Sequence, residues 1–367
     1  MNAFANQIFK SPLRRLPALL TLAAAACAAQ AQSSVQLYGI MDAGVQVSDT
    51  GAPGQGRQYE VGTGNQAGTR LGFRGTEDLG GGLKAVFNLE MGIFNDTGAL
   101  ITFGEPSNIV FGRRSVVGLQ SAFGDIMLGR DYTPAWWNIF QTDRFRLGMP
   151  GTIATSSQVA VTRANNGIFY TSPVLGGGFR GRLAYTLGAE SSSPRDLGRL
   201  AGAQAEYRSG GLLLTAAAQT RTDLVPGSTT NTARLKERGA GLEYAVGNYT
   251  VSAGYWATDP VTATVGAVDR SRAAWLGGTV RLGVGQITAQ VTRTTMDVFG
   301  RGTGRAITAG IAYVHSLSKR TSLYAGIGTV RNDANSRLPL NTGTQRVGGT
   351  VFDADPRALV VGMRHDF

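Results

Sequence analysis

Apolar residues recur at every second position along most of this chain, and this alternation constrains its fold more than any other feature. From Val35 to Val47, apolar or small residues occupy the odd positions, and mostly polar residues occupy the even ones. The same pattern recurs at positions 83–91, 179–187, 201–207, 212–220, 240–244, 249–255, 307–313 and 323–327. A period of two indicates a β-strand with one apolar face and one wet face. The sequence therefore predicts an all-β fold.

The composition favours a closed barrel over a soluble fold with a large dry core. Only 42% of the residues are hydrophobic, and 52 are glycines. After the first 31 residues, no apolar run approaches the roughly 18 residues that a membrane-spanning helix needs. Only helices and closed barrels satisfy their backbone hydrogen bonds in lipid. If the chain spans a membrane, we therefore expect an antiparallel β-barrel, and no helix is apparent.

Short and long connections alternate along the chain. Tight glycine-rich turns, such as Gly80–Gly82, alternate with long polar segments at 48–66, 93–109, 132–164, 222–235, 259–271 and 332–355. Transmembrane β-barrels of the outer membrane have short periplasmic turns at one rim and long extracellular loops at the other. Counting the hairpins predicts about sixteen strands, and a barrel of that size encloses an aqueous lumen.

The first 31 residues have the pattern of a secretory signal. Three basic residues precede an apolar stretch from Leu16 to Ala26, and the small-x-small triplet Ala29–Ala31 follows. Cleavage after Ala31 would leave a barrel domain at residues 32–367, with no cysteine and a net charge of about +8. The alternative is a lipoprotein anchored at Cys27. Small residues precede this cysteine, but leucine is missing from the usual place three residues upstream.

The alternation also assigns a direction to each charged side chain. If the apolar face of each strand contacts lipid, ten basic and five acidic residues point into the lumen. They are Arg70, Arg74, Lys84, Arg114, Arg180, Arg182, Arg208, Arg221, Arg281 and Arg364, and Asp42, Glu90, Glu206, Glu243 and Asp366. This basic excess predicts a lumen that attracts anions. Arg113 and Arg130 fall on the apolar face, so we expect them near a rim, at a subunit contact or after a β-bulge.

Several motifs occur in a fixed order from one end of the chain to the other. They are the segments Ser33–Val45, Thr69–Leu83, Val117–Leu119, Leu128–Arg130, Tyr132–Pro134 and Asn165–Pro173, and a last strand, Val361–Phe367, that ends on an aromatic residue. Together they resemble the general trimeric porins of Gram-negative β-proteobacteria. The resemblance implies a sixteen-stranded barrel that assembles as a homotrimer in outer-membrane lipid and lipopolysaccharide. It also implies that the barrel-assembly machinery recognises Phe367.

The resemblance further implies that the third long loop, at about 132–164, folds into the lumen and narrows it. The length of this segment and its Trp136, Trp137 and Phe140 favour a packed, functional loop over a disordered one. The alternative is a loop that only caps the outer mouth.

For the narrowest section, we predict a set of arginines opposite loop carboxylates. These residues are Arg70, Arg74 and Arg114 on the wall, Asp131 and Asp143 in the loop, and Arg163 where the loop rejoins the barrel. Opposed charges across a narrow aqueous gap create a transverse field that orients dipolar solutes. By resemblance, Arg70, Arg114 and Arg163 are the best candidates for an arginine cluster. The alternative is that several of these arginines are surface charges paired with loop carboxylates.

Features of an enzyme or of a cofactor site are not apparent. His315 and His365 lie far apart and have no neighbouring cysteine, so we expect neither a metal site nor a cofactor. We predict a porin, not an enzyme: a water-filled, anion-preferring channel for passive diffusion of small hydrophilic solutes and inorganic ions, with no nucleic-acid partner. One alternative is a substrate-selective channel of the same fold, and a stacked run of aromatics, which would favour sugars, is not apparent. The other is a barrel without transport function, such as an adhesin or receptor with a plugged lumen.

Overall fold

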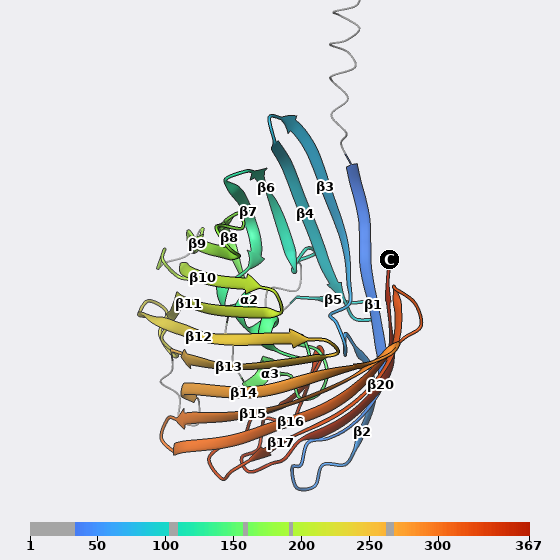
Figure 1. Ribbon diagram of the computed structural model, residues 1–367. Coiled ribbons are helices and arrows are strands. Elements are labelled where there is room, and N and C mark those ends of the chain that lie inside the picture. The colour runs from blue at the N-terminus through green and yellow to red at the C-terminus, as the bar shows by residue number, and fades with distance from the viewer. Residues whose placement is uncertain (1–33, 103–108, 157–160, 191–193, 262–267) are drawn as a thin grey trace, which may run out of the picture.

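Antiparallel strands close into a barrel in this protein (Figure 1). The computed structural model describes residues 34–102, 109–156, 161–190, 194–261 and 268–367. The predicted signal segment at 1–31 lies outside these residues. The ring is closed because β20 (Arg357–Asp366) pairs with both β17 (Thr321–Asn332) and β1 (Ser34–Asp49). The all-β prediction is therefore confirmed.

Eighteen strands of the main sheet occupy sixteen positions around the barrel. In addition to β1, β17 and β20, they are β2 (Gln58–Thr63), β3 (Arg70–Gly80), β4 (Leu83–Ile93), β5 (Leu100–Ile101), β6 (Arg114–Ser121), β7 (Gly124–Tyr132), β8 (Arg163–Thr171), β9 (Phe179–Thr186), β10 (Leu200–Ser209), β11 (Leu212–Leu224), β12 (Thr232–Val246), β13 (Tyr249–Asp259), β14 (Val268–Leu282), β15 (Gly285–Val298) and β16 (Gly302–Ser316). β2 and β3 share one position beside β1, and β5 and β6 share one beside β4. β18 (Leu340–Thr342) and β19 (Gln345–Val347) form a separate hairpin. The predicted count of sixteen is confirmed.

The interruption between β2 and β3 has an identifiable cause in β1. The fully buried Asp42 carboxylate accepts hydrogen bonds from the backbone N–H groups of Gln66, at 2.8 Å, and Ala67, at 2.6 Å. It also accepts one from the Tyr324 hydroxyl, at 2.6 Å. A buried carboxylate is costly unless such donors surround it. The interruption brings residues 66 and 67 to the inner wall, where they help to shape the lumen.

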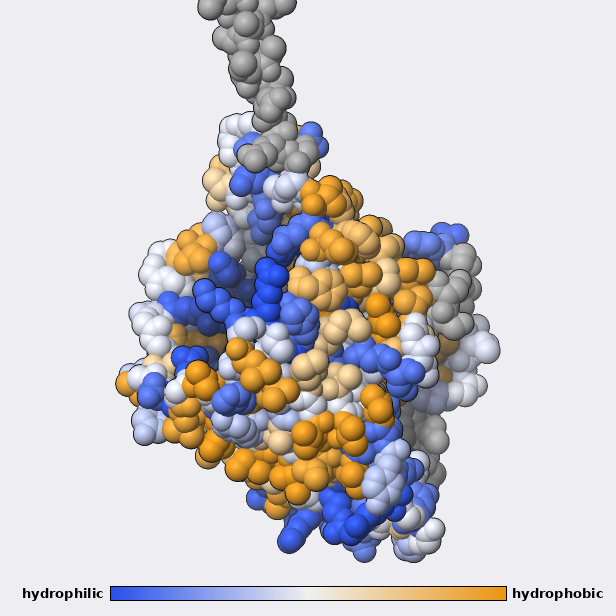
Figure 2. All heavy atoms as spheres, turned by 90° about the vertical axis from the view of Figure 1, so that its right-hand side faces the viewer, coloured by the Kyte–Doolittle hydropathy of each residue, from blue (hydrophilic) through white to orange (hydrophobic). Residues whose placement is uncertain are grey.

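The alternation of side chains agrees with the predicted faces. Val35 is 71% exposed and Val45 is 62% exposed, whereas Gln46 is fully buried on the inner side. Figure 2 shows hydrophobic side chains in broad patches on the outside of one face of the barrel. In a lipid-facing wall such exposure is expected, because apolar residues there contact acyl chains.

In the described residues, two helices interrupt the all-β pattern, and the expectation that the chain has no helix is wrong. They are α2 (Pro134–Thr142) and α3 (Ile153–Ser156), both in the predicted 132–164 loop. Thr133 caps α2, because its side-chain oxygen accepts a hydrogen bond from the N–H of Trp136 and Pro134 follows it in the first turn. Within the described residues, no helix is long and apolar enough to cross a membrane.

The loop that carries these helices packs against inward-facing side chains of the wall. The backbone N–H of Ala135 donates to Gln219 Oε1 on β11 at 3.1 Å, and Gln141 Nε2 donates to Glu206 Oε2 on β10 at 2.6 Å. Beyond α2, Gln290 on β15 donates to Asp143 at 2.9 Å. These contacts agree with Figure 1, in which α2 and α3 lie within the outline of the barrel.

The two arginines on the apolar face are explained by local irregularities. The register of β7 against β8 shifts between Gly129 and Asp131, and beside this shift Arg130 donates to the Gly112 carbonyl at 2.8 Å and to Asn165 Oδ1 at 2.6 Å. Arg113 precedes β6 and is 5% exposed. The expected bulge is therefore present beside Arg130.

Candidate solute pathway

A cavity of about 710 Å³ lies between the loop and the opposite wall of the barrel. Its lining comes from the break between β2 and β3, from α2 and the segment after it, and from β15, β16 and β20. Among the described residues, six arginines line it, and no aspartate or glutamate does. The arginines are Arg70, Arg113, Arg144, Arg146, Arg163 and Arg364. Three carboxylates outside this lining pair with five of the six arginines: Glu90 with Arg70 and Arg113, Glu243 with Arg144 and Arg146, and Asp366 with Arg364. Six basic groups against three acidic ones leave a positive excess around the cavity.

Three of these arginines converge around one carboxylate, Glu90. Arg113 Nε lies 2.5 Å from Glu90 Oε1, and Arg70 Nη1 lies 3.8 Å from Glu90 Oε2. Arg163 joins the group through the Tyr132 hydroxyl, which accepts from Arg163 Nη2 at 2.9 Å and from Arg113 Nη2 at 2.8 Å. One carboxylate therefore balances only part of the charge of three guanidinium groups.

A column of stacked groups positions two of the arginines. The rings of Tyr132, Trp136 and Phe140 stack in sequence, with centroids 3.8 Å and 4.5 Å apart. Arg163 covers the free face of Tyr132 at 4.4 Å, and Arg146 lies over Phe140 at 5.3 Å. The four-residue spacing of the rings corresponds to successive helical turns. The expectation that no aromatic stack lines the lumen is wrong, but the ring faces are covered and only the edges meet the cavity.

Asp143 fastens the loop and does not face the wall arginines. It is fully buried at the end of α2 and accepts from the backbone N–H of Leu147 at 2.8 Å and from Gln290 at 2.9 Å. Arg144, the next residue, forms an ion pair with Glu243 on β12. The loop is therefore held by polar contacts on both sides of residue 143.

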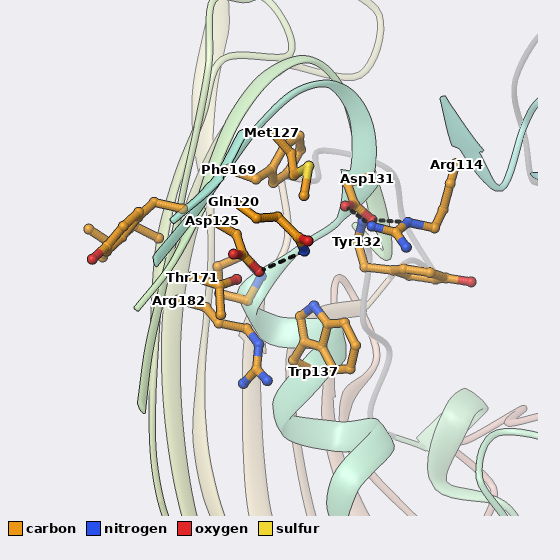
Figure 3. A pocket seen from close by; sticks show the side chains of 13 residues that line it. Arg114, Gln120, Asp125, Met127, Asp131, Tyr132, Trp137, Phe169, Thr171 and Arg182 are labelled. Atoms are coloured by element: carbon orange, nitrogen blue, oxygen red, sulfur yellow. Dashed lines mark hydrogen bonds and ion pairs between the residues drawn. The ribbon is translucent and has the colours of Figure 1, made fainter. Parts of the chain in front are cut away.

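A smaller pocket of about 260 Å³ lies on the other side of the loop, between α2 and strands β6 to β9 (Figure 3). Here Arg114 forms a bidentate ion pair with Asp131, with distances of 2.9 Å and 2.6 Å. Figure 3 shows the Trp137 indole and the Arg182 guanidinium below this pair, and Arg182 lies 4.6 Å from the indole centre. This pocket is less positive because Asp131 and Asp125 also line it.

The predicted site residues therefore fall into separate groups. Arg70 and Arg163 line the large cavity, and Arg114 and Asp131 line the small pocket. Arg74 lines neither, because it is exposed further along β3 and donates to Gln36 Oε1 at 2.9 Å and 2.7 Å.

Sequence reasoning missed Arg144 and Arg146, because residues in a loop do not follow the two-residue alternation that assigns a strand side chain to the lumen or to lipid. The Thr133-Pro134 pair, a typical helix start, was the available signal for α2 and for the stacked column.

Paired charges are common elsewhere in the lumen: Glu206 meets Arg182 at 2.6 Å and Arg208 at 3.4 Å.

Comparison with known proteins agrees with this architecture. A family model described as Gram-negative porin matches residues 18–335. The chain is 33% identical to outer membrane porin protein 32 of Delftia acidovorans over 359 residues, which cover 95% of this chain and 98% of the relative.

Two solved structures are similar to this chain in fold. The anion-selective porin from Comamonas acidovorans has a TM-score of 0.79 and 30% identity, with coverage of 91% of this chain and 100% of that chain. The trimer form of OmpT, an outer membrane protein of Vibrio cholerae, shares the fold at 14% identity and a TM-score of 0.67, over 91% of this chain and 99% of that chain. With sixteen strand positions, a polar interior and a match over most of its length, this chain belongs to the Gram-negative porin family, whose members form channels in the outer membrane.

Proposed function

We propose that this porin is a passive diffusion channel for small hydrophilic solutes and inorganic ions, and that it prefers anions. The observation that carries the proposal is the cavity whose lining, within the described part of the chain, contains six arginines and no acidic residue. Rings of arginine lower the energy of an anion in a pore and raise that of a cation. The name of the anion-selective Comamonas porin supports the same preference. The proposal assigns no catalytic role to any residue.

The constriction lies, in this proposal, between the 132–164 loop and the wall that carries Arg70. Arg70 and Arg163 act directly on passing anions, because both line the large cavity. Arg114 and Asp131 form an ion pair in the small pocket on the other side of the loop, and the net charge of this pair is close to zero. Asp143 keeps the loop in place through its buried hydrogen bonds. Arg74 contributes a more distant positive charge.

The biological assembly is proposed to be a homotrimer in outer-membrane lipid and lipopolysaccharide. The trimer form of the Vibrio cholerae relative supports a trimer only through the shared fold. We also propose that a signal segment is cleaved after Ala31 and that the barrel-assembly machinery binds the C-terminal residue. Phe367 closes the ring by exchanging two backbone hydrogen bonds of 3.1 Å with Gly39.

Reversal potentials in planar bilayers test the selectivity. With purified protein under a potassium chloride gradient, we expect stepwise conductance and a reversal potential of the sign that chloride preference gives. A cation preference would overturn the role of the arginines, and the absence of conductance would favour a plugged receptor or adhesin. A sugar-selective channel is less favoured, because the aromatic faces that sugars would stack on are covered by Arg163, by Arg146 and by one another.

A further inference from the structure

Basic side chains also occur on the outside of the barrel, at the long-loop end of six strands. They are Arg238, Arg272, Arg293, Arg305, Arg331 and Arg357, all exposed. The next outward positions toward the short turns are Ala240, Ala274, Val291, Ile307, Thr329 and Leu359, of which five are apolar. Arginine is strongly disfavoured at the centre of a bilayer but tolerated at its interface. These arginines therefore mark the outer boundary of the apolar band.

An apolar groove of about 720 Å³ runs along the outer wall below two of these arginines. Its lining includes Ala205, Ala216, Ala240 and Ala253, flanked by Phe179, Tyr207, Leu214, Leu242 and Tyr255. The strand register places Ala216 opposite both Ala205 and Ala240, and Ala240 opposite Tyr255. The alanine methyl groups form the floor, because the flanking side chains project further from the sheet. An apolar hollow that extends over β9 to β13 can hold part of a hydrocarbon chain.

The long-loop end of this groove is positively charged. Arg238 follows Ala240 toward the loops by two residues, or about 7 Å along β12. The register places Arg238 and Arg272 on either side of Ala257, which is 3% exposed. Asp259 accepts from Arg238 at 2.9 Å and from Arg270 at 3.0 Å.

The charge at this end of the groove is only partly neutralised. Lys236 is also exposed and points outward. Four basic side chains, Lys236, Arg238, Arg270 and Arg272, lie in this part of the described chain together with three carboxylates, those of Asp259, Asp269 and Asp297, so a basic excess remains. Arg272 forms no ion pair or hydrogen bond with another described residue.

We propose that the outer wall of β10 to β14 binds lipopolysaccharide of the outer leaflet, with an acyl chain in the groove and a lipid A phosphate between Arg238 and Arg272. Guanidinium groups bind phosphate through paired, charge-assisted hydrogen bonds. Anionic headgroups attract basic residues at the membrane surface. The arginines lie on the long-loop side, which faces the cell exterior in such barrels. The site rests on the proposed orientation in the membrane and is independent of the selectivity of the pore.

Native mass spectrometry of the purified full-length protein in detergent micelles tests this site. The probe is a rough-type lipopolysaccharide of defined structure, compared with its enzymatically dephosphorylated form. We expect the double variant R238Q/R272Q to bind the intact probe about tenfold or more weakly, because two charge-assisted contacts are lost. Ala240→Trp, which fills the groove without changing charge, should weaken binding of both forms. The matched control K319Q/R320Q removes the same charge at the exposed short-turn rim and should bind as the unchanged protein does.

The outcomes distinguish lipopolysaccharide from a second subunit as the occupant of the groove. Equal binding by all variants, or equal affinity of the unchanged protein for both forms of the probe, would overturn the phosphate site. If Ala240→Trp instead converts a trimer to monomers, the groove belongs to a subunit interface and the proposal fails. Conductance and reversal potential, measured on the same variants, should stay unchanged, so that failure of the channel proposal is distinguished from failure of this one.

Discussion

The charge of Arg70 provides the sharpest test of the proposed pathway. A sphere with the 710 Å³ volume of the large cavity has a radius of about 5.5 Å, which we take as the distance between Arg70 and a passing ion. In water, two unit charges at that distance interact with about 0.75 kcal/mol. Screening at 0.1 M salt, with a Debye length of about 10 Å, reduces this to about 0.4 kcal/mol. Arg70→Gln removes that attraction for anions and that repulsion for cations, so the anion-to-cation permeability ratio should fall about fourfold.

The assay is the reversal potential in planar bilayers at two mean salt concentrations. At 1 M salt the Debye length is about 3 Å, and the expected effect falls to about 1.5-fold. Arg74→Gln is the matched control, since Arg74 lies four residues along the same strand and lines neither cavity. Glu90 keeps its contact with Arg113 at 2.5 Å in the Arg70 variant, so the fold should be retained. An equal effect of both variants, or an effect that does not depend on salt, would refute the reasoning.

Three further predictions concern the loop, the stacked column and the C-terminus. A side chain at Gly310 would meet the Pro150 carbonyl at 2.2 Å, so Gly310→Leu should displace the loop and raise single-channel conductance. The control is Gly278→Ala, which should leave conductance unchanged because the nearest atom is 3.7 Å away. Unchanged conductance in Gly310→Leu would contradict the position of the loop. Trp136→Ala removes two ring stacks and should lower the free energy of unfolding by about 1 to 3 kcal/mol. The measurement is thermal or denaturant unfolding in detergent. Phe123→Ala, at a turn position that is 85% exposed, is the neutral control. Deletion of Phe367 removes its pairing with Gly39 and should reduce the amount of heat-modifiable, folded protein in outer-membrane fractions, and normal assembly would argue against its proposed role.

Much of the fold could be predicted from the sequence because it is encoded locally. The two-residue period of β1 places Val35 and Val45 outward and Gln46 inward, and the structure has them so. The short-turn rim was also recognisable, since glycines such as Gly81 and Gly82 adopt positive φ angles there. The long-loop rim was less regular than expected: the connection at 299–301 has three residues, and the long connection at 187–199 was missed.

The candidate site was only partly predictable. The two-residue alternation placed Arg70 and Arg114 in the lumen, and Arg114 was expected to face loop acids that included Asp131, with which it pairs. Arg163 was expected where the loop rejoins the barrel, and it lines the large cavity with Arg70. The alternation of inward and outward side chains applies to strands and not to loops, so Arg144 and Arg146 could not be assigned to the cavity. Asp143 was expected to face the wall arginines, but its surroundings depend on Gln290, which lies 147 residues away along the chain.

The sequence by itself determined that this chain forms a closed barrel with an apolar outside and a basic inside. That information is repeated in every strand, because each strand must satisfy the lipid and the lumen separately. Only the tertiary structure decided which charges meet. The loop was positioned by polar contacts with four distant strands, and the register shift of β7 against β8 placed Arg130 beside Asn165, to which it donates a hydrogen bond. Electrostatic selectivity depends on distances between such residues, and these distances are set by long-range pairing that a local pattern does not encode.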